Sequence, residues 1–231
     1  MKVTKILMAA SILLASVTAQ SQDVNSLLKQ VKARMDKVND YEASGSMKTN
    51  VTFLKVPEAI VKIYFKKPNK LKIKNEKGIS FVPKGAVSIN LNSILAGNNY
   101  TVIDAGVDKS ATGILRVVKL LPLDDNADIV LSTLYIDEAN SVIKKAKTTT
   151  RENGSYELNM TYGKYIGYGL PDKIIFTFNT KDYKLPKGVT FDFDDGSDAK
   201  KKPGAAKSKN GSAEILFNSY IINKGVADVN F

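Results

Sequence analysis

The side chains that most often carry catalysis or bind metals are few in this sequence. The 231 residues include no His and no Cys, which excludes a Ser-His-Asp triad, a Cys-His pair and a zinc site with imidazole ligands. Asp, Glu, Ser and Lys are present, so hydrolysis by a carboxylate pair or a Ser-Lys pair stays open on composition alone. Because no spacing singles out such a pair, we predict a protein that is not an enzyme and that needs no cofactor or metal.

Apolar side chains that alternate with polar ones are the better candidates for a function. A strand turns successive side chains to opposite faces of a sheet, so alternation places the apolar ones on one face. Such a face can line a cavity for an acyl chain or fill an ordinary core, and alternation alone does not separate the two. The candidate lining residues are Val61, Ile63, Phe65, Leu71, Ile73, Leu158, Met160, Phe176 and Phe178.

An amphipathic helix is predicted ahead of the strands. Residues 23–39 have apolar side chains at helical spacing, basic residues on the opposite face, and Asp23 in the position of an N-cap. We expect the apolar stripe to pack against the sheet as a cap. Its members are Val24, Leu27, Leu28, Val31, Met35 and Val38.

From residue 42 onward the apolar spacing changes to two, which is typical of strands. The predicted strands are Glu42–Leu54, Glu58–Lys66, Lys70–Asn75, Tyr100–Ala105, Ile114–Leu121, Ile129–Ile136, Val142–Arg151, Tyr156–Tyr165, Ile174–Thr180, Val189–Asp194 and Ala213–Asn223. So many strands with so few helices predict a mainly β fold, a strongly curved antiparallel sheet that forms an unclosed β-barrel.

Two further segments are less regular. Val87–Leu95 fits either a strand or a second short lid helix. Residues 194–212 form a charged, glycine-rich insert with almost no apolar side chain, and such a composition predicts a mobile loop.

The N-terminus has the pattern of a secretory signal peptide. Lys2 and Lys5 precede an apolar run at residues 6–15, and small residues follow at Val17–Ala19. We predict cleavage after Ala19, which leaves residues 20–231 as a single domain in the periplasm. The absence of Cys also means that the protein cannot itself be acylated as a bacterial lipoprotein.

The protein is basic. Its formal net charge is +11, and removal of Lys2 and Lys5 with the signal peptide lowers this to +9. Such a balance favours attraction to anionic membrane surfaces or acidic partners. No helix-turn-helix, RNA-recognition or zinc-finger pattern occurs, so nucleic acid is not an expected partner.

Four segments resemble the LolA family, periplasmic carriers of lipoproteins between the inner and outer membranes. Residues 36–44 (DKVNDYEAS) are similar to the junction between the family's helix and first strand, and 62–73 (KIYFKKPNKLKI) to its strand–Arg-Pro-Asn–strand hairpin. Residues 113–162 resemble its middle meander, and 178–194 (FNTKDYKLPKGVTFDFD) its closing hairpin. The resemblance implies an unclosed antiparallel barrel capped by helices, with an apolar cavity for acyl chains.

Three features depart from the family pattern. Ile73 stands where the family commonly has an aromatic residue, and residues 195–231 extend past the closing hairpin. Lys67 replaces the arginine that, in the family, helps to hold the lid closed. A lysine is a point donor and cannot reproduce the forked hydrogen bonds of a guanidinium. By resemblance we expect Lys67 to contact the lid.

The combined prediction is a monomeric carrier that takes lipoproteins or lipids toward the outer membrane. Its partners would be acyl chains, an inner-membrane release machinery and an outer-membrane acceptor. Two alternatives stay open: an outer-membrane β-barrel and an exported binding module for another ligand. Lys62 and Lys72 argue against the barrel, because a lipid-facing charge costs roughly 2–4 kcal/mol.

Overall fold

In the part of the chain that the structure describes, helix α2 (Val24–Met35) lies across an antiparallel sheet. A computed structural model describes residues 23–51, 54–55, 57–68, 70–77, 95, 99–110, 113–151, 154–179 and 210–231. Its elements are α2 (Val24–Met35), β1 (Asp40–Val51), β2 (Leu54–Lys55), β3 (Ala59–Lys66), β4 (Lys70–Lys77), β5 (Tyr100–Ser110), β6 (Gly113–Pro122), β7 (Ile129–Asp137), β8 (Val142–Thr150), β9 (Ser155–Thr161), the 3₁₀-helix η1 (Ile166–Tyr168), β10 (Lys173–Asn179), β11 (Asn210–Ile222) and the 3₁₀-helix η2 (Asp228–Asn230). The predicted mainly β class is confirmed.

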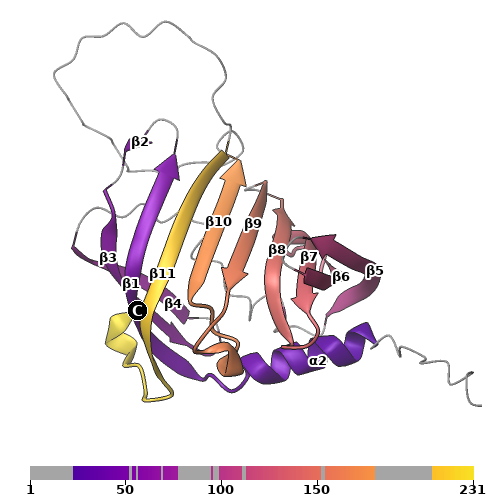
Figure 1. Ribbon diagram of the computed structural model, residues 1–231, viewed down its shortest axis with the longest axis horizontal. Coiled ribbons are helices and arrows are strands. Elements are labelled where there is room, and N and C mark those ends of the chain that lie inside the picture. The colour runs from indigo at the N-terminus through magenta and orange to yellow at the C-terminus, as the bar shows by residue number, and fades with distance from the viewer. Residues whose placement is uncertain are drawn as a thin grey trace, which may run out of the picture.

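All described strands belong to one antiparallel sheet. Its strand order is β4-β3-β1-β11-β10-β9-β8-β7-β6-β5, and β2 pairs with β1 beside this path. Figure 1 shows the sheet curving from β4 round to β5, with α2 across the lower ends of β8 and β7. Within the described strands, β4 and β5 end the path and do not pair with each other. The predicted curved, unclosed sheet with a helical cap is therefore confirmed.

One face of the sheet is mainly apolar. Its exceptions include Ser132 and Thr148, which lie opposite each other on β7 and β8, and Arg116 of β6. Antiparallel partners project to the same face, so the pairing registers trace that face from strand to strand. Met47 lies opposite both Ala59 and Ile215. Ile174 in turn lies opposite Ile215 and Met160. We call this the inner face, because α2 packs against it, and the opposite one the outer face.

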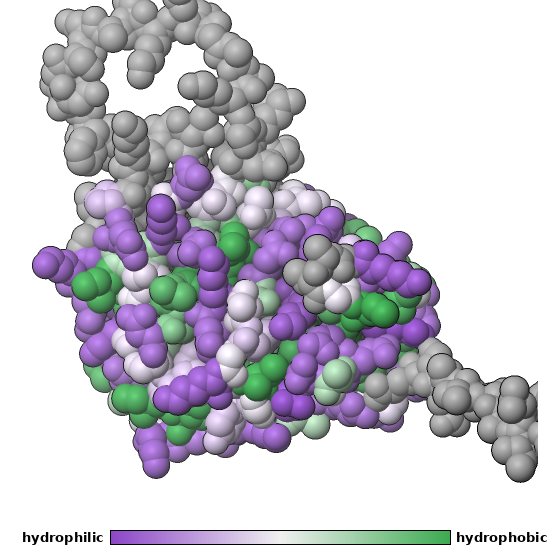
Figure 2. All heavy atoms as spheres, in the orientation of Figure 1, coloured by the Kyte–Doolittle hydropathy of each residue, from purple (hydrophilic) through white to green (hydrophobic). Residues whose placement is uncertain are grey.

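The buried apolar side chains of the inner face form two clusters. The first cluster lies between α2 and strands β6 to β10, and it includes Leu27, Leu134 and Leu158. The second cluster lies on β1, β3 and β11, and it includes Val61 and Ile63. The outer side is different: Figure 2 shows mostly hydrophilic residues over β1, β11, β10 and β9, with hydrophobic ones scattered among them.

Helix α2 begins where the sequence predicts and ends earlier. The Asp23 carboxylate accepts a hydrogen bond from the Ser26 N–H at 3.2 Å and so caps the helix. The apolar stripe is buried as expected over its first two turns. The helix then ends at Met35 rather than at Asn39, so the predicted range of 23–39 is too long.

Val38 shows why the helix ends early. Helical spacing places Val38 on the stripe of α2, but it follows the helix and is buried in the second cluster. Its N–H donates to Met35 O at 3.1 Å, a bond to the third residue back that tightens the last turn. The chain leaves the helix because Val38 packs against the sheet, and spacing within the helix does not encode that contact.

Several other boundaries also differ from the prediction. The strand predicted at Tyr156–Tyr165 ends at Thr161, after which the chain turns through η1. The strand predicted at Glu42–Leu54 is divided into β1 and β2. Residues 210–212 of the predicted loop belong to β11, where a Cβ on Gly211 would collide with the ring of Phe178.

Some predictions fall outside the described residues. These are the signal peptide at 1–19, the strand Val189–Asp194, the remainder of the 194–212 loop, and all of Val87–Leu95 except its last residue. Leu95 is helical and buried in the first cluster, with 1% of its surface exposed. The single domain over residues 20–231 stays a prediction.

A bulge keeps β11 in step with β1. Ser44 lies opposite Ser219, whereas Gly45 lies opposite Phe217, so one extra residue of β11 is accommodated between the two pairs. The extra residue exchanges the faces of β11 at that point. As a result Phe217 and Tyr220 both belong to the second cluster on the inner face.

We predict that Gly45→Ala destabilises the fold. A Cβ at position 45 would overlap the backbone carbonyl of Leu216, and backbone cannot move aside as the end of a side chain can. Urea unfolding should show a loss of about 1–3 kcal/mol. Gly167→Ala is the control, because no heavy atom lies within 4 Å of its Cβ position, and its effect should stay within about 0.5 kcal/mol. Equal stability of the two variants would contradict this account.

Candidate functional site

The nine predicted lining residues all project from the inner face. Ile63 lies opposite Ala43 and Ile73, and Phe65 lies opposite Tyr41 and Leu71. The residues of β9 and β10 also share this face. Leu158 lies opposite Phe176, and Met160 and Phe178 each lie two residues farther along the same strands. Whether these side chains bind a ligand stays a prediction, but their common face follows from the register.

The nine residues do not form one group. Leu158, Met160, Phe176 and Phe178 belong to the first cluster, beneath α2. Val61, Ile63 and Phe65 are buried in the second cluster, and Leu71 and Ile73 pack against it. The clusters meet where Ile174 of β10 pairs with Ile215 of β11. Alternation identifies the face correctly. It does not show that the nine residues lie on distant strands of the sheet and fall into two clusters.

Some inner-face side chains are only partly buried. They include Leu71 and Ile73 of β4, Tyr41 of β1 and Ile174 of β10. Apolar atoms that stay accessible on a face that is otherwise packed are the natural contacts for an apolar ligand. They lie around the second cluster and at its border with the first.

Tyr41 is the most elaborately packed of these residues. Its ring stacks on Phe65 with centroids 5.2 Å apart and meets the Tyr220 ring edge-on at 5.3 Å. Burial raises the pKa of the Tyr41 phenol above its ordinary value. Burial also raises the pKa of Tyr220, whose hydroxyl donates to Pro171 O at 2.7 Å. Both phenols therefore stay neutral at physiological pH and can pack or donate a hydrogen bond, but not act as bases.

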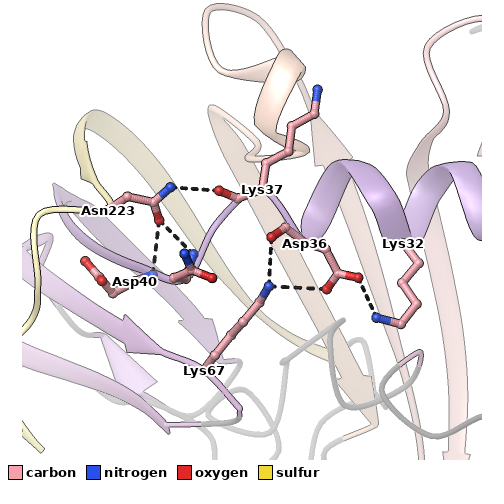
Figure 3. Close-up of polar contacts among 7 residues, drawn as sticks. Lys32, Asp36, Lys37, Asp40, Lys67 and Asn223 are labelled. Carbon is pink, nitrogen blue, oxygen red and sulfur yellow. Dashed lines mark hydrogen bonds and ion pairs between the residues drawn. The ribbon is translucent and has the colours of Figure 1, made fainter.

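Lys67 contacts the C-terminal end of α2, and its role as a lid contact stays a prediction. Its Nζ donates to the backbone O of Asp36, the C-cap of α2, at 2.9 Å, and it pairs with Asp36 Oδ1 at 3.2 Å (Figure 3). Lys32 Nζ approaches the other carboxylate oxygen at 2.6 Å. A single ammonium thus reaches a carbonyl and a carboxylate together, in the position that the family gives to an arginine.

The Asp36 carboxylate is stabilised in its charged form. Partial burial raises its pKa, but hydrogen bonds from Lys32 and Lys67, with their charges, outweigh that effect and leave the pKa below its ordinary value. A lowered aspartate pKa stabilises the fold above the ordinary pKa, and this contribution is lost as the pH falls through the lowered value. The ion pair is therefore fully formed at neutral pH.

Asn223, which sequence reasoning did not select, completes this junction. Its side chain links the end of β11 to the segment between α2 and β1 (Figure 3). The available signal was the Asn223-Lys224-Gly225 sequence at the end of the strand predicted over 213–223, which is typical of a turn. That signal predicts a turn and does not identify what the side chain of Asn223 contacts.

Other kinds of site are not found in the part of the chain that the structure describes. No three His, Cys, Asp or Glu side chains gather there as a metal ion would require. No helix among those residues combines the length and the apolar character needed to cross a membrane.

These observations define a class of protein: an open, curved antiparallel sheet whose apolar inner face is capped by an N-terminal helix. Comparison with solved structures identifies this architecture as a LolA-like fold, as the sequence resemblance predicts. No family model matches the chain. No curated protein matches it either.

Three solved structures share the fold. One, described as an outer membrane lipoprotein-sorting protein domain from Vibrio parahaemolyticus, has a TM-score of 0.57 and covers 88% of this chain and 94% of its own. A DUF1329 family protein from Desulfovibrio piger has a TM-score of 0.56, with 89% and 94% covered. A LolA superfamily protein from Nitrosomonas europaea has a TM-score of 0.55, with 88% and 96% covered. Each is 11% identical to this chain, so the likeness establishes the fold.

We predict that Lys67→Leu loosens the end of α2. Loss of one charged hydrogen bond between partly exposed groups should cost about 1 kcal/mol, which corresponds to roughly fivefold faster amide exchange at the last turn of α2. Lys72→Leu, in the same hairpin but on the outer face, should leave that exchange unchanged. Wild-type exchange rates in Lys67→Leu would show that Lys67 is a solvated turn residue that does not stabilise the end of α2.

Proposed function

We propose that the protein is an exported periplasmic carrier that binds the acyl chains of lipoproteins or lipids against its inner face, with α2 as a lid. The observation that carries this proposal is the mainly apolar inner face, whose two clusters extend from β3 to β6 along the sheet and meet between β11 and β10. None of the nine lining residues carries a charge. A surface of this kind recognises hydrocarbon by removing it from water and does not depend on a specific polar contact.

The surface that we assign to the ligand is the partly buried border of the second cluster. Tyr41, Leu71 and Ile73 are only partly buried there, and Ile174 extends the surface toward the first cluster. An acyl chain laid along it would gain roughly 0.8 kcal/mol for each buried methylene before ordering costs. The closely packed residues, such as Phe65, would support this surface from beneath.

Lipoproteins are the favoured class of cargo. One structure with the same fold is described as a lipoprotein-sorting domain, and the sequence has the pattern of a secretory signal. We expect loading from a release machinery in the inner membrane and delivery to an acceptor at the outer membrane, by a monomer cleaved after Ala19. The net charge of +11 over the full chain would favour encounters with anionic membrane surfaces.

Native mass spectrometry of protein purified from its own periplasm tests this function. We expect a bound species whose mass and fragments identify an acyl lipid or an acylated peptide. A bound ligand without acyl chains would instead favour an exported binding module for another compound. Protein that carries no ligand and binds no added fatty-acyl probe would contradict the proposal.

The position of the ligand is tested by two neighbouring residues of β4. We predict that Leu71→Glu abolishes binding of a fluorescent fatty-acyl probe, because a carboxylate on the inner face would have to lose its water as the chain binds. Leu71 suits this test better than Phe65, which is only 3% exposed and whose replacement would disrupt the core.

Lys72→Glu is the matched control, since Lys72 is exposed and points to the outer face of the same strand. It should bind the probe with wild-type affinity. Equal affinity of both variants, each shown to be folded by circular dichroism, would place the ligand elsewhere.

A further inference from the structure

The chain continues past β11 and returns to the junction that holds α2. Residues 223–231, which we call the C-terminal clamp, follow β11 and include η2, seen in yellow near the C-terminus in Figure 1. Val226 is buried with 8% of its surface exposed, so the clamp packs against the body of the protein. It makes two sets of polar contacts, one on each side of the Lys67–Asp36 contact.

The first set joins the clamp to the segment between α2 and β1. Asn223 Nδ2 donates to Lys37 O at 2.7 Å, and Asn223 Oδ1 accepts from Asn39 N–H, also at 2.7 Å (Figure 3). Both ends of one amide are thus used within three consecutive residues of that segment. Nearby, the Gly225 N–H donates to Asp40 Oδ1 at 2.9 Å.

The backbone of Asn223 is adapted to this task. Its φ is +56°, in the left-handed region that asparagine tolerates better than most residues. Its own N–H donates to Asp40 O at 2.9 Å. The backbone of Asn223 is therefore held in place, which fixes the starting point of its side chain.

The second set joins the clamp to the β3–β4 hairpin. Asp228 Oδ1 lies 3.0 Å from the Nζ atoms of both Lys66 and Lys70, which stand on the two strands beside the turn that carries Lys67. Hydrogen bonds and charges from the two lysines hold the pKa of Asp228 below its ordinary value. Farther along, Lys74 Nζ donates to Asn230 Oδ1 at 3.4 Å.

Asn39 links the clamp to the turn that carries Lys67. The N–H of Asn39 is bound by Asn223, while its carbonyl accepts the backbone N–H of Lys67 at 2.8 Å. The backbone that leaves α2 is therefore held from both sides. The ammonium of Lys67 reaches Asp36 from a turn whose position is fixed in this way.

We infer that the C-terminal clamp positions the contact between Lys67 and Asp36, with Asn223 as its principal positioning residue. A lysine has a flexible side chain and a single donor group. Its contact therefore depends more than that of an arginine on the relative position of its turn and its acceptor. The clamp fixes this relative position, because it binds both the β3–β4 hairpin and the segment that follows α2. The role of α2 as a lid rests on the proposed function, but the positioning does not depend on any ligand.

Amide hydrogen exchange of the full chain tests the clamp. Asn223→Gly removes the side-chain amide while keeping a residue that accepts a positive φ. We expect roughly fivefold faster exchange or more at the last turn of α2 and at Asn39, the factor that one or two hydrogen bonds supply, with β8 and β9 unchanged. Asp228→Asn should have a smaller effect in the same direction, which disappears at high salt because its ion pairs are exposed.

The control is Glu214→Gln, which removes an exposed ion pair to Lys173 (3.1 Å) outside the clamp and should leave exchange in α2 unchanged. The double variant of Lys67→Leu with Asn223→Gly should lose less than the two single losses combined, since both act on one contact. Additive losses, or wild-type exchange at α2 in Asn223→Gly, would overturn the inference. Failure of the wild type to bind an acyl probe would overturn the proposed function and leave the exchange result to decide on the clamp.

Discussion

The continuous register of the sheet is the constraint on which the rest of the structure depends. A shift of one residue in any strand would turn its apolar side chains from the inner to the outer face. The register continues from β4 to β5 through several irregularities, and the one in the middle of the sheet is where Gly45 lies opposite Phe217. Without that bulge, either Ile215 or Tyr220 would face outward, and the second cluster would lose part of its core.

Helix α2 is not part of the sheet, so strand pairing does not fix its position. Apolar packing and polar contacts fix it instead. The first two turns of α2 bury an apolar stripe in the first cluster, at roughly 1.5–3 kcal/mol for each large side chain. The last turn packs Met35 against the same cluster, and its end is held by polar contacts from Lys67 to Asp36 and from Arg34 to Ile166 O. Asn223 binds the segment that follows the helix. Each such contact contributes about 1 kcal/mol, so the two ends of one helix are held with very different strength.

The difference between these interactions also decides what the sequence could predict. Alternation over Val61, Ile63 and Phe65 reports local geometry that any strand shares, so the face of each strand and the mainly β class could be predicted. The division into two clusters could not, because it arises from the path of the sheet. The spacing of Val38 fits the stripe of α2, so the sequence predicts that it belongs to the helix. Its contact with the sheet, which spacing does not encode, places it outside the helix. Lys67 could be selected by family resemblance, whereas Asn223 acts across 186 positions of sequence from Lys37, and no local pattern encodes that distance.

The carrier function that we propose requires both firm binding and release, and the distribution of contacts around α2 suits both needs. If polar contacts held the whole helix, thermal fluctuation and salt would open it freely. If apolar packing held the whole helix, opening would cost several buried side chains at once. In this fold the end of α2 leads to Val38 of the second cluster, against which the partly buried Tyr41 and Leu71 also pack. An opening at this end would break the contacts of Lys67 and Asn223 together with the hydrogen bonds from Arg34 and Lys37 to η1, while the stripe buried in the first cluster keeps the helix attached to the sheet.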